Sequence, residues 1–213
     1  MIKINQDSAG QSVRSNNVDE LGGVNFVRPS VNTVGAASKA LNVSRQSCMA
    51  VISEYTRWDL VWLEVRNWLI LVMPTILKKR PVTTFGLQYT DVFQWKADPA
   101  SLVVSEVLSK NSDYLPKNVF DSKSLWHSHH GFLKKEQAPI PHDLLENVNV
   151  NMLENNGQRS IQIVTSHRVT LATPSWKVDE PLDQLMPSLH LRNKAIIGNL
   201  LTPAVQATIK LNG

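Results

Sequence analysis

Residues 48–95 read CMAVISEYTRWDLVWLEVRNWLILVMPTILKKRPVTTFGLQYTDVFQW, and this stretch decides the fold. Side chains alternate over residues 49–53 in the manner of a short, largely buried strand. Over residues 60–76 the apolar residues recur instead at helical spacing, with a polar face beside them. Alternation returns over residues 83–89. The stretch therefore predicts a strand, a long helix and a second strand, in that order.

Both ends of this helix carry residues that suit helix termini. Thr56 and Asp59 have the spacing of a capping box, in which side chains satisfy free backbone N–H groups. Three basic residues occupy positions 78–80, where cations suit the negative end of the helix dipole, and Pro81 stops the helix. Pro74 lies inside the pattern, so we expect a kink or an early end there.

The remainder of the chain predicts five further segments. Asp98 and Pro99 begin a helical pattern, and residues 124–135 indicate a strand. Residues 144–171 predict a β-hairpin. Residues 173–187, with three prolines, are interpreted as a loop, and residues 189–201 as a closing helix.

The hairpin can be assigned a register. Apolar residues alternate with asparagines before Asn156-Gly157, a pair that tolerates the positive φ of a two-residue turn. This turn sets apolar residues opposite apolar residues and acidic residues opposite basic ones or histidine. The predicted pairs are Met152 with Ile161, Val150 with Ile163, Glu154 with Arg159, and Glu146 with His167.

This order of elements favours an α+β fold with a mostly antiparallel sheet, a long capped helix after the first strand and a C-terminal helix. Residues 1–23 are polar and predict a flexible N-terminal arm. Residues 24–213 predict a single α+β domain; the alternative is two small lobes with a boundary near residues 110–123.

Composition narrows the class of protein. Of the 213 residues, 42% are hydrophobic and 19% charged, as in ordinary globular proteins. The net charge of +4 is small for a dedicated nucleic-acid binder. Cys48 is the single cysteine, which excludes an internal disulfide. The first residues lack a signal-peptide pattern, and the most apolar run, residues 68–73, is too short to span a bilayer, so we expect a cytoplasmic protein without a membrane partner.

Three short segments of the sequence resemble a known family of proteins. They are Tyr55-Thr56-Arg57-Trp58-Asp59, Gly86-Leu87-Gln88-Tyr89-Thr90-Asp91, and the segment from Leu189-His190 to Leu201-Thr202-Pro203. Together they resemble a sporadically distributed family of bacterial proteins that has no assigned biochemical activity. The resemblance spans about residues 40–205. Gln88 stands where that family usually has Arg, and Asp91 where it usually has Asn, so any role of that Arg is absent or altered here.

The resemblance also supplies candidate binding residues. They are Tyr55, Arg57, Trp58, Asp59, Gln88, Tyr89 and Asp91. A hydrogen-bond network that stabilises the fold explains the same residues equally well. The sporadic distribution implies an accessory gene of a mobile element, a phage or a defence system.

Histidines offer a second type of candidate site. His127 and His129 share one face of the predicted strand and could bind Zn²⁺ with a third ligand. The usual cysteine partners and helical spacings are missing, so an ordinary polar strand face is the favoured interpretation. Glu146 and His167 could mimic a catalytic dyad across the hairpin, although a structural pair is favoured.

Three functional hypotheses follow. The first is a non-enzymatic protein-interaction or regulatory domain that binds another protein, or itself, through the arm and an exposed sheet edge or aromatic patch. The second is nucleic-acid binding through basic residues and tryptophans. The third is a metal-dependent hydrolase that uses the strand histidines. No phosphate-binding or nucleophile motif is present, and no cofactor is expected.

Overall fold

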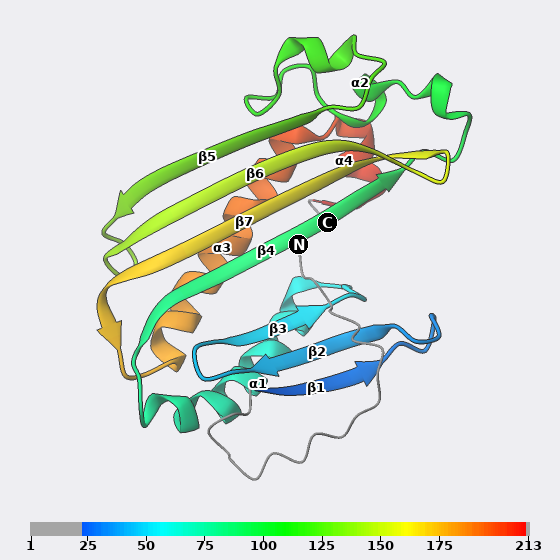
Figure 1. Cartoon of the computed structure of the whole chain (residues 1–213). Coiled ribbons are helices and arrows are strands. Elements are labelled where there is room, and N and C mark those ends of the chain that lie inside the picture. The colour runs from blue at the N-terminus through cyan, green and yellow to red at the C-terminus, as the bar shows by residue number, and fades with distance from the viewer. Residues whose placement is uncertain (1–22, 212–213) are drawn as a thin grey trace. The chain divides into compact units, whose positions relative to one another are not determined.

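The computed structural model describes residues 23–211, and the flexible arm predicted for residues 1–23 lies almost entirely outside them. The chain divides into two compact units, Met1–Met73 and Pro74–Gly213, each with its own antiparallel sheet. The α+β class predicted from the sequence is confirmed, as are the long helix after the first strands and the C-terminal helix (Figure 1).

The first unit contains a three-stranded sheet in the order β1-β2-β3, with β1 at Val24–Pro29, β2 at Ala37–Val43 and β3 at Cys48–Ile52. The alternation over residues 49–53 predicted β3, whereas residues 23–41 carry only a weak strand signal, at Val24, Phe26 and Val31, which Pro29 breaks. β1 is exposed along its whole length, which explains the weak signal, because an exposed edge strand needs no alternation of apolar residues.

Helix α1 follows at Trp58–Leu77. Its first backbone hydrogen bond runs from the Val61 N–H to the Arg57 carbonyl, and Asp59 pairs with Arg57. Pro74 does not end the helix early, since the helix continues to Leu77. Glu64 forms an ion pair with Lys39 and lies 3.6 Å from Arg28, which joins the helix to β2 and β1.

By length and composition, α1 is long and apolar enough to cross a membrane, and it is the one such helix in the described residues. The sequence argument considered only residues 68–73, whereas the helix has 20 residues. The expectation that no segment could span a bilayer was therefore wrong on length. Val61 is the one buried residue of this helix, and its other apolar side chains are exposed or half-buried.

The second unit is built on a four-stranded antiparallel sheet in the order β4-β7-β6-β5. These long strands are β4 at Val82–Gln94, β5 at His127–Glu136, β6 at His142–Asn155 and β7 at Gln158–Ser175. Every hairpin pair predicted from the sequence is present in the β6–β7 register. Asn156 and Gly157 form the turn with φ values of 50° and 75°.

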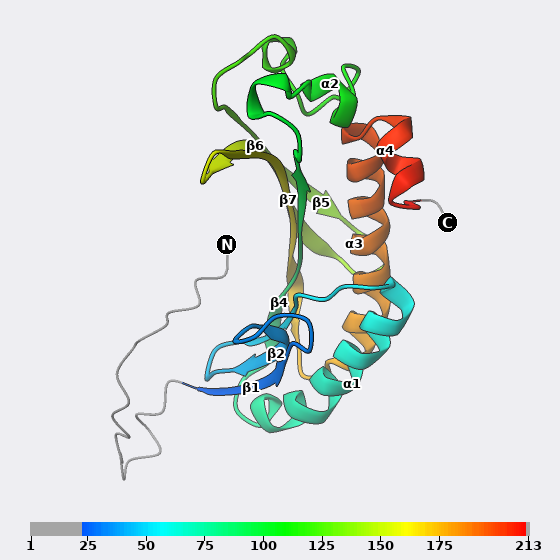
Figure 2. The same ribbon diagram turned by 90° about the vertical axis from the view of Figure 1, so that its right-hand side faces the viewer.

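Helix α3, at Asp179–Leu200, covers one face of this sheet (Figure 2). The loop predicted for residues 173–187 was wrong, because β7 extends to Ser175 and α3 begins at Asp179. Pro181 lies in the first turn of α3, where the missing N–H needs no partner. Pro187 lies within the helix, beside the buried Met186.

Short helical segments connect β4 to β5 and close the chain. The connection contains η2 at Pro99–Ser101, α2 at Val104–Val107 and η3 at Lys117–Phe120, so the helix predicted from Asp98 is reduced to two short pieces. Helix α4 spans Pro203–Thr208. Thr202 precedes it as the N-cap, and the Thr202 hydroxyl accepts a hydrogen bond from the Val205 N–H. These segments and the end of α3 pack with β6 and β7 into one hydrophobic core.

Candidate functional site

Alternate residues of the long strands point to opposite sides of the four-stranded sheet. On one side they pack under α3, and we call this the covered face. No other element of the same unit lies over the opposite side, which we call the open face (Figure 2). Its residues are Thr84, Gly86, Gln88, Thr90, Val92 and Gln94 of β4; Ser160, Gln162, Val164, Ser166, Arg168 and Thr170 of β7; Asp143, Leu145, Asn147, Asn149, Asn151 and Leu153 of β6; and His127, His129, Gly131, Leu133 and Lys135 of β5.

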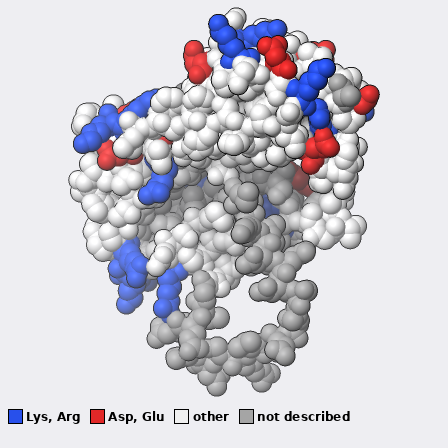
Figure 3. Space-filling model, turned by 45° about the horizontal axis from the view of Figure 1, so that its top comes forward, with Lys and Arg blue, Asp and Glu red and all other residues white. Residues whose placement is uncertain are grey.

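Most of the open face consists of uncharged polar side chains. Only Arg168, Asp143 and Lys135 are charged, and all three lie toward the end of the sheet where β6 begins. The central rows contain asparagine, glutamine, serine, threonine and histidine. Two of these amides bond across strands: Asn147 to the Ser166 hydroxyl at 3.5 Å and Asn151 to the Gln162 amide oxygen at 3.4 Å. Figure 3 likewise shows charged side chains in separate groups with uncharged surface between them.

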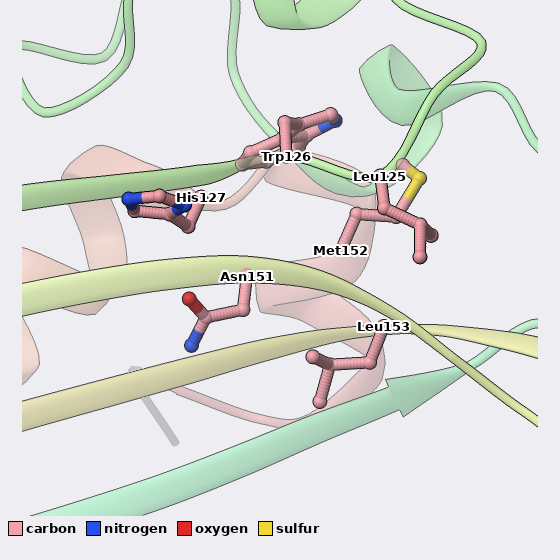
Figure 4. A pocket seen from close by; sticks show the side chains of 6 residues that line it. All are labelled: Leu125, Trp126, His127, Asn151, Met152 and Leu153. Atoms are coloured by element: carbon pink, nitrogen blue, oxygen red, sulfur yellow. The ribbon is translucent and has the colours of Figure 1, made fainter.

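A shallow pocket lies at the end of the sheet where β5 begins (Figure 4). Its lining combines His127, Asn151 and Leu153 of the open face with Leu125, Trp126 and Met152. Leu125 and Leu153 are exposed, and the buried indole N–H of Trp126 has no hydrogen-bond partner among the described residues. The pocket therefore offers apolar surface next to polar groups, which suits a side chain of a bound polypeptide.

The two histidines of the metal hypothesis are placed as the sequence predicted, since both point to the open face and both are exposed. No third ligand joins them: in residues 23–211 no three His, Cys, Asp or Glu side chains are grouped to hold a metal ion. The structure therefore gives the metal hypothesis no support.

The pair of Glu146 and His167 lies on the covered face, with the Glu146 Oε2 atom 3.4 Å from His167 Nδ1. Both side chains are buried beneath α3, and neither ring nitrogen of His167 has a well-aligned hydrogen-bond partner. His167, and then Lys134 at 3.3 Å, lower the pKa of Glu146, while burial works in the opposite direction. Both side chains are shielded from solvent, so the arrangement is that of a structural contact rather than an accessible catalytic dyad.

Within the second unit, the residues suggested by the family resemblance point to both faces of the sheet. Gln88 points to the open face, whereas Tyr89 and Asp91 point to the covered face, where burial raises the pKa of Asp91. The Tyr89 hydroxyl lies 2.9 Å from Nδ1 of His190 on α3, which joins two of the three motifs. The pKa of His190 is lowered by burial and by Lys194.

The remaining residues of that set belong to the first unit, at the start of α1. The Arg57 guanidinium makes two contacts with the Asp59 carboxylate, at 3.1 and 3.0 Å, and both side chains are exposed. Trp58 stacks on Trp62, with ring centroids 5.5 Å apart. Tyr55 is also exposed. Burial raises the pKa of the Cys48 thiol, which disfavours a reactive thiolate.

Comparisons with protein-family models, with curated proteins and with solved structures find no match to this chain. The family resemblance described above therefore stays a prediction. Sequence reasoning did not identify the open face as a site. The alternation of asparagines with valines in β6 was the available signal, because it placed uncharged amides along one side of a strand.

Proposed function

We propose that this chain is a non-enzymatic protein-interaction domain, and that the open face of the four-stranded sheet is its binding surface. The observation that carries this proposal is the scarcity of charge on a broad sheet face that no described element of the second unit covers. Solvent-facing positions are ordinarily rich in Lys, Glu, Arg and Asp. Depletion of charged residues is also the compositional feature that distinguishes the cores of protein interfaces from other surface.

The chemistry of the open face suits an uncharged polypeptide partner. Asparagine and glutamine amides both donate and accept hydrogen bonds, as do the hydroxyls of serine and threonine, so they can match backbone groups in either sense. The pocket that contains Leu125 and Leu153 adds an apolar position. Nucleic acid fits less well, because phosphates need several cations and the central rows carry none.

Enzymatic function receives no comparable support. Active sites combine a well-formed concave pocket with titratable groups whose pKa values are strongly perturbed. Here the pocket is shallow, and the Glu146–His167 pair lies beneath α3. The third hypothesis, a hydrolase using His127 and His129, therefore gains no argument from the geometry.

The experiment uses the full chain with an affinity tag in its native host. Asn149 lies in the middle of the open face, so Asn149→Arg places a cation there with little effect on packing. Leu191→Arg is the matched control, because Leu191 is 65% exposed on α3. We expect a protein that copurifies in stoichiometric amount with the wild type and with Leu191→Arg, but not with Asn149→Arg. In a direct binding measurement, that purified protein should likewise bind the wild type and Leu191→Arg but not Asn149→Arg.

Two results would contradict this function. Equal capture by both variants would exclude the open face as the binding surface. Copurification of nuclease-sensitive material that dissociates with salt, in place of a protein, would favour the nucleic-acid hypothesis. A variant that lacks residues 1–23 tests separately whether the predicted arm contributes.

A further inference from the structure

The outer edge of β5 is a second surface of interest. β5 is the terminal strand of its sheet and pairs only with β6 among the described strands. An edge strand presents unpaired N–H and C=O groups, which form a template for another strand. The segment around Tyr114 packs against side chains of β5: its carbonyl accepts a hydrogen bond from Ser128, and its ring lies edge-on to those of His130 and Phe132. No backbone hydrogen bond from another described element occupies the outer edge from His130 to Glu136.

The side chains of this edge differ from those of the opposite edge. β5 carries Phe132, 40% exposed, and Leu133, 75% exposed, at successive positions that point to the two faces of the sheet. Along the opposite edge, β4, Val92 is the exposed large apolar residue. A strand added beside β5 would shield an apolar side chain on each face at once, which neither β4 nor an isolated surface leucine offers.

We infer that β5 pairs with β5 of a second copy of this chain, antiparallel, about a two-fold axis at Leu133. In this register Leu133 lies opposite Leu133 of the second copy, and Phe132 lies opposite Lys134. Within one chain Lys134 Nζ already lies 5.9 Å from the Phe132 ring centroid, so the cation and the ring are compatible neighbours. The two sheets join into one continuous sheet whose open faces lie on the same side.

Two further pairs follow from this register. Lys135 lies opposite Gly131, which has no side chain to obstruct the lysine stem, and His130 lies opposite Glu136, whose carboxylate also accepts hydrogen bonds from Arg192 of its own chain. Shifting the axis to Phe132 would set Lys134 and Lys135 against His130 and His129. Shifting it to Lys134 would place two lysines directly opposite each other, which is destabilising. Shifting it to Gly131 would place Glu136 opposite Trp126, which lies before the start of β5.

This inference concerns the outer edge of β5 and a second copy of this chain; Leu133 also belongs to the open face, but the two proposals can fail separately. A monomeric wild type overturns the pairing of β5 and leaves the effect of Asn149→Arg on a heterologous partner unchanged. If no other protein binds the wild type, the proposed function is overturned, whereas the dimer stays in place.

The first measurement is the mass of the full chain in solution by analytical ultracentrifugation. We expect a dimer that Leu133→Lys weakens by at least about tenfold in Kd, because it adds two cations at the axis beside Lys134 and Lys135. Val92→Lys is the matched control: the same change at an exposed position of the opposite edge should leave the dimer intact. A monomer at every soluble concentration, or a dimer that survives Leu133→Lys, overturns the inference.

The second measurement tests the register through cross-linking in a Cys48→Ser background. Residues directly opposite in an antiparallel pair have Cα atoms about 4.5–5.5 Å apart, within the range that a disulfide spans. Leu133→Cys should therefore form a covalent dimer under mild oxidation, and Val92→Cys should not. Equal cross-linking of both variants would mean random collision and would overturn the register.

Discussion

The two faces of the four-stranded sheet are made by alternate residues of the same strands, yet they differ in chemistry. On β6 and β7, valine, isoleucine, leucine and methionine fill most of the covered face, and asparagine, serine and glutamine make up half of the open one. Both faces share the same backbone hydrogen bonds. Because the covered face buries its apolar side chains, we expect stability to depend mainly on that face.

The largest expected effect is the loss of packing on the covered face. Ile163 is fully buried there, and Ile163→Ala should lower the free energy of unfolding by about 2–5 kcal/mol, because it removes buried methyl groups and leaves a cavity. Val164, the next residue, points to the open face and is only half-buried. Val164→Ala should cost less than about 1 kcal/mol in urea denaturation. Similar losses for both variants would show that the open face is as tightly packed as the other.

A smaller effect is expected at the polar contact between the covered face and α3. The hydroxyl of Thr165 donates a hydrogen bond to the side-chain oxygen of Asn193, and both residues are buried. Asn193→Ala would leave a buried hydroxyl without its partner and should cost about 1–3 kcal/mol. Adding Thr165→Val to this variant should restore part of the loss. If the second substitution adds to the loss instead, the hydrogen bond is not the stabilising feature.

Lowering the pH should weaken the contribution that Glu146, on the covered face, makes to the free energy of unfolding. Its pKa in the folded chain lies below the ordinary value of 4.5, first because of His167 and then Lys134. A lowered folded-state pKa stabilises the fold above about pH 4.5, and this stabilisation is lost as the pH falls through the lower folded value. The stability difference between wild type and Glu146→Gln should therefore shrink between pH 6 and pH 3.

The control for this pH dependence is Glu154→Gln. Glu154 forms an ion pair with Arg159 near the hairpin turn, where its side chain is 40% exposed, and exposed pairs contribute little. Its stability difference from wild type should be small throughout the series. The stability difference between wild type and Glu146→Gln could instead stay constant with pH. That result would mean that the charge of Glu146 is not the stabilising feature of the covered face.

The comparison also shows what sequence patterns could predict. Alternation and Asn156-Gly157 predicted the β6–β7 register correctly, because a two-residue turn and a period of two are local properties. The first turns of α3 were missed, because Pro181 and Pro187 resemble loop signals until the buried side chains beside them are known. That His127 and His129 share a face was predictable. That the face is uncovered depends on where α3 packs, which no local pattern contains.

The smallest expected effect on stability, and the one that bears most on function, is that of Asn149→Arg. Its neighbours across the strands are His129 and Val164, so an arginine at this position can extend into solvent. The free energy of unfolding should change by no more than about 0.5 kcal/mol. Loss of the protein partner together with unchanged stability would separate binding from folding. A strongly destabilised variant would instead mean that the open face is part of the packed structure, and the contrast between the two faces would no longer hold.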